Sequence, residues 1–257
     1  MDLKDQKNFH GKNVQKKHYQ FIKKYRMKKK YSIIIVSLNT KNHFLETLNS
    51  IIRQTYKNYE IIVVDGFSTD GTRDEILKNK KKISKIIIEK DKGIYDAMNK
   101  GLKKASGKWV IFMNSGDIFV SKNTINLINS RLNWSYDIVY GDTIIRTKNF
   151  NFLKRSSKFY NNTVVMPFSH QSTVVKLNIL KKRKFNINYK FSSDFDFFYD
   201  SYLKEKKFKK INKVLSKVRS KGSSDLNRLN VLSENINILK KYNSGFLILY
   251  FHIIYYL

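Results

Sequence analysis

The chain has 257 residues, of which 51 are Lys or Arg and 20 are Asp or Glu, so its formal net charge is +31. It contains no cysteine, which excludes a disulfide framework and a thiolate metal site. A charge of this size attracts polyanions such as nucleic acid, an anionic membrane surface or nucleotide phosphates, although lysine dispersed with Asn and Ile through every segment also fits a general composition bias.

The two ends of the chain differ in composition from its middle. Residues 1–30 are rich in lysine and have no sustained period, which predicts a basic extension without the apolar core of a signal peptide. Residues 246–257 are apolar apart from His252, but they are shorter than the ~20 residues that span a bilayer. This tail is expected either to lie on a membrane surface beside Lys240 and Lys241, or to pack on its own domain or a second copy. The predicted units are a basic extension over 1–30, a single α/β domain over 31–221 and a helical, apolar extension over 222–257.

Four short apolar runs in the first half of the chain predict strands that are buried on both faces. The runs cover residues 33–36, 61–64, 86–88 and 110–113. Between them, apolar residues recur at helical spacing, and Thr72 and Glu75 have the offset of a capping box that begins the second helix. Strands that alternate with helices form βαβ units, so we expect an α/β fold with a mostly parallel sheet flanked by helices.

The second half of the chain is less regular. Strands are predicted over residues 138–142, 173–175 and 206–221, and a helix over 231–239. Residues 191–202 combine aromatic side chains with three carboxylates, Asp194, Asp196 and Asp200. We expect the rings to pack in a core. Carboxylates beside apolar rings are costly unless they are paired, hydrated or used in chemistry, so these acids need a further reason.

Polar residues follow each of the four predicted strands in the first half. They are Asn39, Asp65, Asp91 and Asp117. The carboxyl ends of parallel strands meet at one edge of an α/β sheet, and such sheets bind ligands there. A single Asp after a strand commonly forms a turn, but four polar ends at one edge favour a binding site. Asp117 is the hard oxygen ligand that a divalent cation on a diphosphate requires.

Four motifs that occur in order resemble the family 2 glycosyltransferases, which have the GT-A fold, over roughly residues 31–222. They cover residues 32–39, 61–72, 91–101 and 114–117. The resemblance is to the branch that builds bacterial surface polysaccharides such as colanic acid and O-antigen. It implies a GT-A-like, Rossmann-like domain that transfers a sugar, with inversion, from a nucleotide diphosphate donor, expected to be a UDP-sugar, to a hydroxyl of a glycan or lipid-linked acceptor.

The resemblance also assigns roles to residues at the predicted edge of the sheet. Those expected at the nucleotide are Ser37, Asn39, Asp65, Asp91, Gly93, Asn99 and Asn114. A carboxylate suits the hydrogen-bond donors of a uracil edge or of ribose hydroxyls. The acidic metal motif of the family falls on residues 114–117, where Asn114 and Gly116 replace acids and Asp117 is the remaining carboxylate. We therefore expect Asp117 to bind a divalent cation, Mn²⁺ or Mg²⁺.

The catalytic base of the family usually lies in a Glu-Asp pair that begins a helix in the second half. Ser193 and Asp194 match this pair, with Ser193 in place of the Glu. Asp194 is therefore expected to take the proton of the attacking acceptor hydroxyl, and Asp196 is the alternative on the acceptor side. His170 and Gln171 resemble a polar motif near the acceptor in this branch, although a lone His is more often structural.

Two other functions remain open on the sequence. A sugar-phosphate nucleotidyltransferase would share the sheet and the metal, but it needs a Gly-rich, basic loop after the first strand, which residues 37–40 do not supply. A nucleic-acid-binding protein would need its basic and aromatic residues on one face, and here they are dispersed. The expected partners are a nucleotide-sugar donor, a glycan or lipid-linked acceptor and an anionic membrane surface at the cytoplasmic side, without specific nucleic acid.

Overall fold

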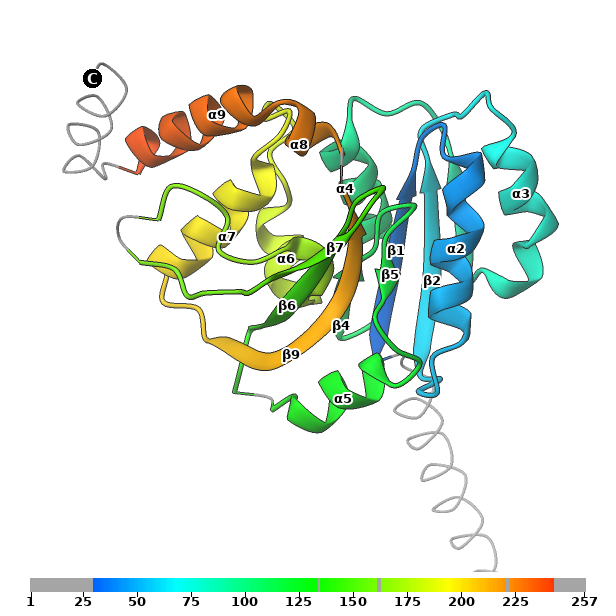
Figure 1. The fold of residues 1–257 in the computed structure, drawn as a ribbon, viewed down its shortest axis with the longest axis horizontal. Coiled ribbons are helices and arrows are strands. Elements are labelled where there is room, and N and C mark those ends of the chain that lie inside the picture. Colours follow the sequence, from blue (N-terminus) through cyan, green and yellow to red (C-terminus); the bar gives the residue numbers. More distant parts are fainter. Residues whose placement is uncertain (1–29, 134, 161–162, 221, 243–257) are drawn as a thin grey trace, which may run out of the picture.

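The computed structural model describes residues 30–133, 135–160, 163–220 and 222–242. Within these residues, a mixed nine-stranded sheet is flanked by helices on both faces (Figure 1). The strands follow the order β3-β2-β1-β4-β8-β6-β9-β5, and β7 pairs with β6. The basic extension predicted before Lys30 and the apolar tail predicted over 246–257 lie outside the described residues.

The four strands predicted in the first half form the parallel part of the sheet. They are β1 (Tyr31–Ser37), β2 (Tyr59–Asp65), β3 (Lys85–Ile88) and β4 (Trp109–Phe112). β1 lies between β2 and β4 and is parallel to both, and β3 is parallel to β2. The carboxyl ends of all four strands therefore meet at one edge of the sheet, as the sequence predicted.

Helices cover both faces of this parallel part. The connecting helices are α2 (Lys41–Ile52), α3 (Thr72–Lys78) and α4 (Ile94–Lys104), with a 3-10 turn η1 (Lys80–Lys82) after α3. Successive side chains of a strand point to opposite faces. Ile33 packs in one core with Phe44 of α2, and Ile34 packs in the other with Met98 of α4. Burial on both faces explains why β1, β2 and β4 are continuous apolar runs. The same expectation was wrong for β3, which lies at the edge of the sheet and is only half-buried.

The capping box predicted for Thr72 and Glu75 was wrong. Gly71, at φ +90°, precedes the helix, and Thr72 is the first residue of α3. The Thr72 hydroxyl donates to Asp70 and accepts the N–H of Thr40 at 2.9 Å, so it ties the loop to the start of α2. The N–H of Glu75 bonds instead to the carbonyl of Gly71 at 3.3 Å.

The second half extends the sheet with strands of both directions. They are β5 (Ile118–Phe119), β6 (Ile138–Arg146), β7 (Asn151–Lys154), β8 (Thr173–Lys176) and β9 (Phe208–Arg219), which confirms the three strands predicted there. β8 is antiparallel to β4 and to β6, so β6 and its parallel neighbour β9 run in the same direction as β4. Arg146 and Arg219, at the ends of β6 and β9, thus reach the same edge as the end of β4.

The remaining helices lie around the second half of the sheet. They are α5 (Thr124–Arg131), the 3-10 turn η2 (His170–Ser172), α6 (Leu177–Arg183), α7 (Ser193–Leu203), α8 (Ser223–Leu226) and α9 (Arg228–Lys241). Helix α9 packs on α7, and α8 packs on α9. The rings of Phe195, Phe197 and Phe198 on α7 are buried in one aromatic core, as predicted. In the described part of the chain, no helix combines the length and apolarity that crossing a bilayer requires.

Candidate active site

The loops that follow β1 and β2 are held together around a buried carboxylate, Asp65. Asp65, the last residue of β2, accepts hydrogen bonds from the N–H of Ser68 at 2.7 Å and from its hydroxyl at 2.6 Å. The Ser68 hydroxyl in turn accepts the N–H of Asn39, and the amide oxygen of Asn39 accepts the N–H of Thr69. Asn39 adopts a left-handed φ of +51°. Ser68 therefore connects Asp65 to Asn39, and the two residues border the carboxyl edge of the sheet.

Two further predicted residues adjoin this loop. Ser37 is paired with Asp65 in the sheet register, and its hydroxyl lies 2.7 Å from that of Thr40. Asp91 accepts the N–H of Gly93 at 2.9 Å. The second carboxylate oxygen of Asp91 lies only 2.3 Å from where a Cβ on Gly66 would stand, so a side chain at Gly66 would displace it. The close approach places Asp91 directly beside the end of β2.

A tight turn follows β4 at the centre of the edge. The N–H of Asp117 bonds to the carbonyl of Asn114 at 2.9 Å, and the Thr47 hydroxyl donates to the carbonyl of Asp117 and accepts the N–H of Gly116. Gly116 has a φ of +100°, and a Cβ there would stand 2.8 Å from the Arg219 side chain. An acidic residue at this position would be strained and crowded, which explains the glycine.

Asp117 is the buried carboxylate of this turn. It is 5% exposed, and it accepts the N–H of Arg219 at 3.0 Å and the side-chain amide of Gln171 at 2.9 Å. Burial raises the pKa of Asp117 to about 6, because these two hydrogen bonds and the charges of His170 and Arg146 only partly offset the loss of water. Ionisation of Asp117 therefore lowers the stability of the fold, which is common for carboxylates at functional sites.

Two arginines frame the same turn. The Arg146 guanidinium donates to the carbonyl of Gly116 and pairs with Glu46 of α2. The Arg219 guanidinium lies 2.6 Å from the Nδ1 of His43. These residues close the turn with positive charge, which is the sign that a diphosphate requires.

Asp194 begins helix α7 and connects the acceptor side to the turn. One carboxylate oxygen accepts the N–H of Phe195 at 2.9 Å and lies 2.8 Å from the Tyr95 hydroxyl. The other lies 3.0 Å from the Nδ1 of His170, whose Nε2 lies 3.2 Å from the amide nitrogen of Asn114. The imidazole of His170 thus bridges Asp194 and Asn114. The four side chains form one chain of polar contacts from α4 to the end of β4.

The protonation of Asp194 follows from these contacts. Burial alone would raise the pKa of its carboxyl, but the hydrogen bonds and charge of His170 and the hydroxyl of Tyr95 outweigh burial and hold the pKa below its ordinary value. Asp194 is therefore ionised at neutral pH. The side chain retains 16% exposure, so it is not sealed from an acceptor.

The turn η2 positions the two residues predicted on the acceptor side. His170 contacts Asp194, and the adjacent Gln171 contacts Asp117. Two adjacent residues thus connect the predicted base to the predicted metal ligand. The structure brings both residues into the site, although it assigns them to orienting contacts with carboxylates.

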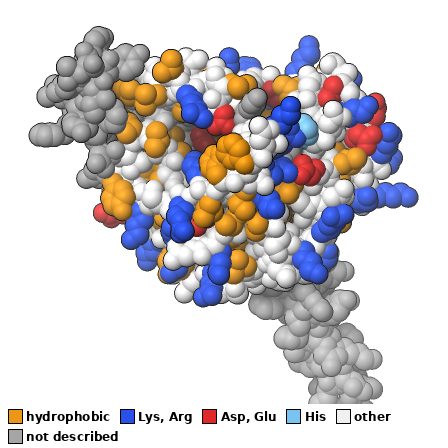
Figure 2. Space-filling model, in the orientation of Figure 1, with side chains coloured by type: hydrophobic (Ala, Val, Ile, Leu, Met, Phe, Trp, Pro, Cys, Tyr) orange, Lys and Arg blue, Asp and Glu red, His pale blue; other side chains and the backbone are white. Residues whose placement is uncertain are grey.

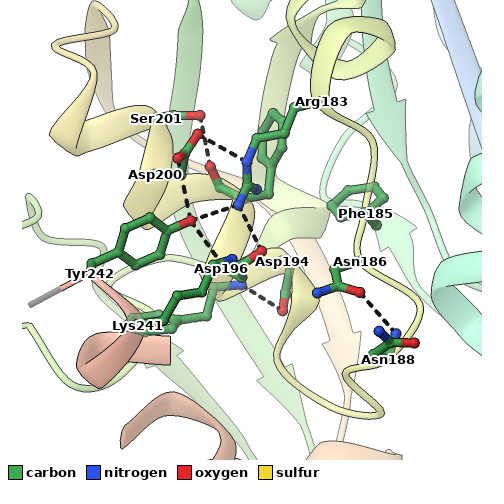
Figure 3. Close-up of polar contacts among 12 residues, drawn as sticks. Arg183, Phe185, Asn186, Asn188, Asp194, Asp196, Asp200, Ser201, Lys241 and Tyr242 are labelled. Carbon is green, nitrogen blue, oxygen red and sulfur yellow. Dashed lines mark hydrogen bonds and ion pairs between the residues drawn. The ribbon is translucent and has the colours of Figure 1, made fainter. Parts of the chain in front are cut away.

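Asn99 and Asp196 have other partners. The amide of Asn99 pairs with both backbone groups of Phe185, at 2.8 and 3.0 Å, which anchors α4 to the segment after α6. Asp196 is 1% exposed and contacts Arg183 at 2.7 Å, Lys241 at 3.2 Å and the Tyr242 hydroxyl at 3.1 Å, as Figure 3 shows. The structure therefore does not bring either side chain together with Asp194 and Asp117.

Asp200 shares the face of α7 that carries Asp196, because the two residues are four apart in the helix. It pairs with the Nε of Arg183 at 2.9 Å (Figure 3). It also pairs with Lys204, four residues later. These ion pairs explain why Asp196 and Asp200 are tolerated beside aromatic rings, which the sequence alone did not explain. They join α7 to α6 and α9, and thereby fix the helix that carries Asp194.

The residues of the turn offer limited support for a divalent cation. Among the described residues, no group of three or more His, Cys, Asp or Glu side chains is placed to hold a metal. The buried amide oxygen of Asn114 has no hydrogen-bond partner within the same described part of the chain, and it lies in one turn with Asp117. One carboxylate and one free amide oxygen fit a Mg²⁺ or Mn²⁺ ion whose other ligands come from substrate phosphates and water.

The sequence prediction missed three residues of this site. Tyr95 lies in one of the motifs, but the sequence predicted no role for it. Arg146 and Arg219 end strands in the irregular half, and nothing in their local sequence indicates that both strands reach the turn after β4. Two long-range pairings would have been needed to find these arginines: β5 with β9, which brings Arg219 to the turn, and β6 with β9, which places Arg146 beside Arg219.

Comparisons with known proteins identify the family of the chain. A family model described as Glycosyl transferase family 2 matches residues 32–211. The PGL/p-HBAD biosynthesis glycosyltransferase of Mycobacterium tuberculosis is 35% identical over 127 residues, which are 48% of this chain and 50% of the relative. The UDP-Glc:alpha-D-GlcNAc-diphosphoundecaprenol beta-1,3-glucosyltransferase WfaP of Escherichia coli is 44% identical over 101 residues, 38% of this chain and 39% of WfaP. The chain spans about half the length of the mycobacterial relatives it matches.

Solved structures share the fold. Staphylococcus aureus TarS 1-349, in complex with UDP-GlcNAc, has a TM-score of 0.62 at 21% identity and covers 76% of this chain and 59% of its own. The mannosyltransferase PcManGT of Pyrobaculum calidifontis, in complex with GDP-Man and Mn²⁺, has a TM-score of 0.57 at 16% identity, with 72% and 56% covered. These similarities establish the predicted GT-A-like fold. The family model matches well over half of the chain, and the protein therefore belongs to glycosyl transferase family 2.

Proposed function

We propose that the protein transfers a sugar from a nucleotide diphosphate, with a UDP-sugar as the expected donor, to a hydroxyl of a glycan or lipid-linked acceptor in the synthesis of a bacterial surface polysaccharide or glycolipid. The observation that carries the proposal is the gathering of Asp65, Asp91 and Asp117 at the carboxyl edge of the sheet, with Asp194 connected to the same turn through His170. Membership of family 2 and names of relatives that contain UDP-Glc support the choice of donor.

The nucleotide is proposed to lie over the ends of β1, β2 and β3. Asp65 and Asn39 hold the loop that borders this region, and Asp91 offers a carboxylate to ribose or base donors. The diphosphate is then directed toward the turn after β4, where Arg146 and Arg219 offset its negative charge. A divalent cation held by Asp117 and Asn114 would supply further charge stabilisation for the leaving diphosphate when bound.

Asp194 is the proposed base of a single displacement with inversion. The acceptor oxygen forms a bond to the anomeric carbon as the bond from that carbon to the diphosphate oxygen breaks, and the acceptor proton passes to the carboxylate of Asp194. Its low pKa keeps it ionised and ready to accept, and His170 and Tyr95 fix its orientation. Ser193, which stands beside it, offers no carboxylate for this step.

The direct test replaces Asp194 with Asn. We expect transfer from UDP-glucose or UDP-N-acetylglucosamine to fall by about 10²–10⁴, while donor binding, measured as a rise in Tm, stays at the wild-type level. The matched control is Asp74→Asn, a substitution of an exposed acid on α3 that should leave both measurements unchanged. Near-normal transfer by the Asp194→Asn enzyme would rule out the role of base.

A further inference from the structure

An exposed apolar surface lies on the hairpin formed by β6 and β7. Phe150, Phe152 and Leu153 are 64%, 47% and 45% exposed, and all four residues of β7 are exposed. The two phenylalanine rings stand 6.2 Å apart between centroids. Figure 2 shows hydrophobic side chains gathered over this part of the face, with Lys and Arg side chains around them. Leu153 follows Phe152 in β7 and so points to the opposite face, whereas the two phenylalanine rings lie together. We call Phe150 and Phe152 the hairpin surface. Exposed large apolar side chains gathered in one place indicate a surface that meets a partner.

The hairpin and the segment that follows it carry only positive charges, although Arg146 is paired with Glu46 of α2. The flanking cations are Arg146, Lys148, Lys154, Arg155 and Lys158, and no acidic residue occurs from 143 to 193. A surface of apolar and aromatic tips ringed by cations is the pattern that binds an anionic lipid interface, where rings enter the headgroup region and cations pair with phosphates.

The hairpin surface adjoins the candidate active site at both ends. β6 ends at Arg146, which contacts Gly116 of the turn. β7 ends at Lys154, which interacts electrostatically with Asp194 and with Asp225 of α8. Leu226, which follows Asp225, is also 69% exposed. An object bound to the hairpin surface would therefore stand beside the acceptor side of the site.

We propose that the hairpin surface docks the protein on an anionic bilayer and presents the site to acceptors at the membrane surface. The benefit for catalysis rests on the proposed function, because a lipid-linked acceptor stays in the bilayer, but the docking itself does not depend on a donor. A second copy of the chain fits less well. An interface between identical surfaces would oppose two rings of cations in a chain of charge +31, which would repel each other.

The test measures cosedimentation with vesicles of phosphatidylglycerol and phosphatidylcholine in the absence of any donor. The full chain should bind these vesicles, and pure phosphatidylcholine should bind it much less. The double variant Phe150→Ser/Phe152→Ser should bind at least about tenfold more weakly. The matched control is Leu77→Ser, which removes a 48% exposed apolar side chain of α3 and should bind as the wild type does.

A second pair of variants tests the electrostatic part of the proposal. Lys148→Gln and Lys158→Gln each remove one exposed cation next to the hairpin surface and should each weaken vesicle binding by about fivefold. The hairpin turn should survive the double Phe variant, because Thr147 bonds the backbone N–H and carbonyl of Phe150 rather than its ring. An unchanged melting curve would verify this.

Two outcomes would contradict the docking proposal, and the Tm shift with donor separates it from the proposed function. Wild-type binding by the double Phe variant would show that another segment, such as residues 246–257, carries membrane attachment. A dimer in light scattering that the double Phe variant disrupts, without any vesicle binding, would identify a second copy as the occupant. Donor-induced shifts in Tm should be equal in wild type and variant. If no donor raises the Tm of either the wild type or the variants, the proposed function would be contradicted and the docking proposal would not.

Discussion

Two buried carboxylates lie at opposite edges of the sheet and differ in their surroundings. Glu60, near the amino end of β2, is contacted by the Ser32 hydroxyl, by the N–H and hydroxyl of Ser106, and by Lys85 at 2.9 Å. Asp117, after the carboxyl end of β4, accepts two hydrogen bonds and has no directly paired cation among the described residues. Burial raises the pKa of both groups, but the donors lower that of Glu60 to about 2, whereas the pKa of Asp117 stays raised to about 6.

The difference in pKa separates a carboxylate that stabilises the fold from one that is available to a ligand. At the amino edge the donors compensate a buried charge fully, so Glu60 stabilises the fold. At the carboxyl edge, two hydrogen bonds do not fully compensate the buried charge of Asp117. Its carboxylate would therefore be stabilised further by a bound ligand such as a cation. Active sites are commonly where stability is given up in this way.

Among the tests of this comparison, Asp117→Asn should have the largest effect. Loss of the carboxylate should lower kcat by about 10²–10³, since charge stabilisation of the leaving group is usually the largest single contribution of such a site. Steady-state kinetics of transfer from a UDP-sugar measures it. The amide of Gln171 can rotate to present its oxygen to the new Asn, so the variant should stay folded. A kcat within about threefold of wild type would remove Asp117 from the mechanism.

The same substitution should have the opposite effect on stability. A carboxyl whose pKa is raised on folding stabilises the fold while it is protonated, and this contribution is lost as the pH rises from about 4 through about 6. At pH 7 the ionised Asp117 therefore costs the fold on the order of 3 kcal/mol. In urea unfolding at pH 7, Asp117→Asn should be at least as stable as wild type, and its advantage should shrink at pH 5. A marked loss of stability at pH 7 would contradict the comparison.

Glu60→Gln should destabilise the protein without altering the chemistry. The pKa of Glu60 is lowered on folding, so its contribution of about 3 kcal/mol is present above the unfolded value near 4.5 and is lost as the pH falls toward 2. Urea unfolding at pH 7 should show this loss, while kcat of the folded fraction stays unchanged. Glu89→Gln, which alters a 55% exposed side chain, should change stability by less than about 0.5 kcal/mol.

The smallest effect concerns the orientation of Asp194. Tyr95→Phe removes a buried hydroxyl 2.8 Å from its carboxylate, and we expect kcat to fall by about tenfold with KM for the donor unchanged. The hydroxyl helps to lower the pKa of Asp194, so the acid limb of the pH–rate profile should move to higher pH in the variant. A lower kcat without that movement would indicate a purely structural role for Tyr95.

The parallel half of the sheet was predictable because continuous apolar runs and the polar residues after them are local signals. The convergence of Asp65 and Asp91 followed from strand direction alone. The surroundings of Asp117 were not predictable, because Arg219 reaches it through the pairing of β9 with the two-residue strand β5, about 100 residues earlier in the chain. Asn99 was assigned to the nucleotide from its motif, and only the structure shows its contacts with Phe185.

The most direct test of the central claim is a calorimetric titration of the folded protein with UDP and UDP-glucose, with and without Mn²⁺. If the carboxyl edge is a site for a sugar nucleotide, both ligands should bind, and Asp117→Asn should weaken binding while Glu60→Gln leaves it unchanged. A fully folded wild-type protein that binds no nucleotide sugar under any of these conditions, with GDP-mannose included, would contradict the account.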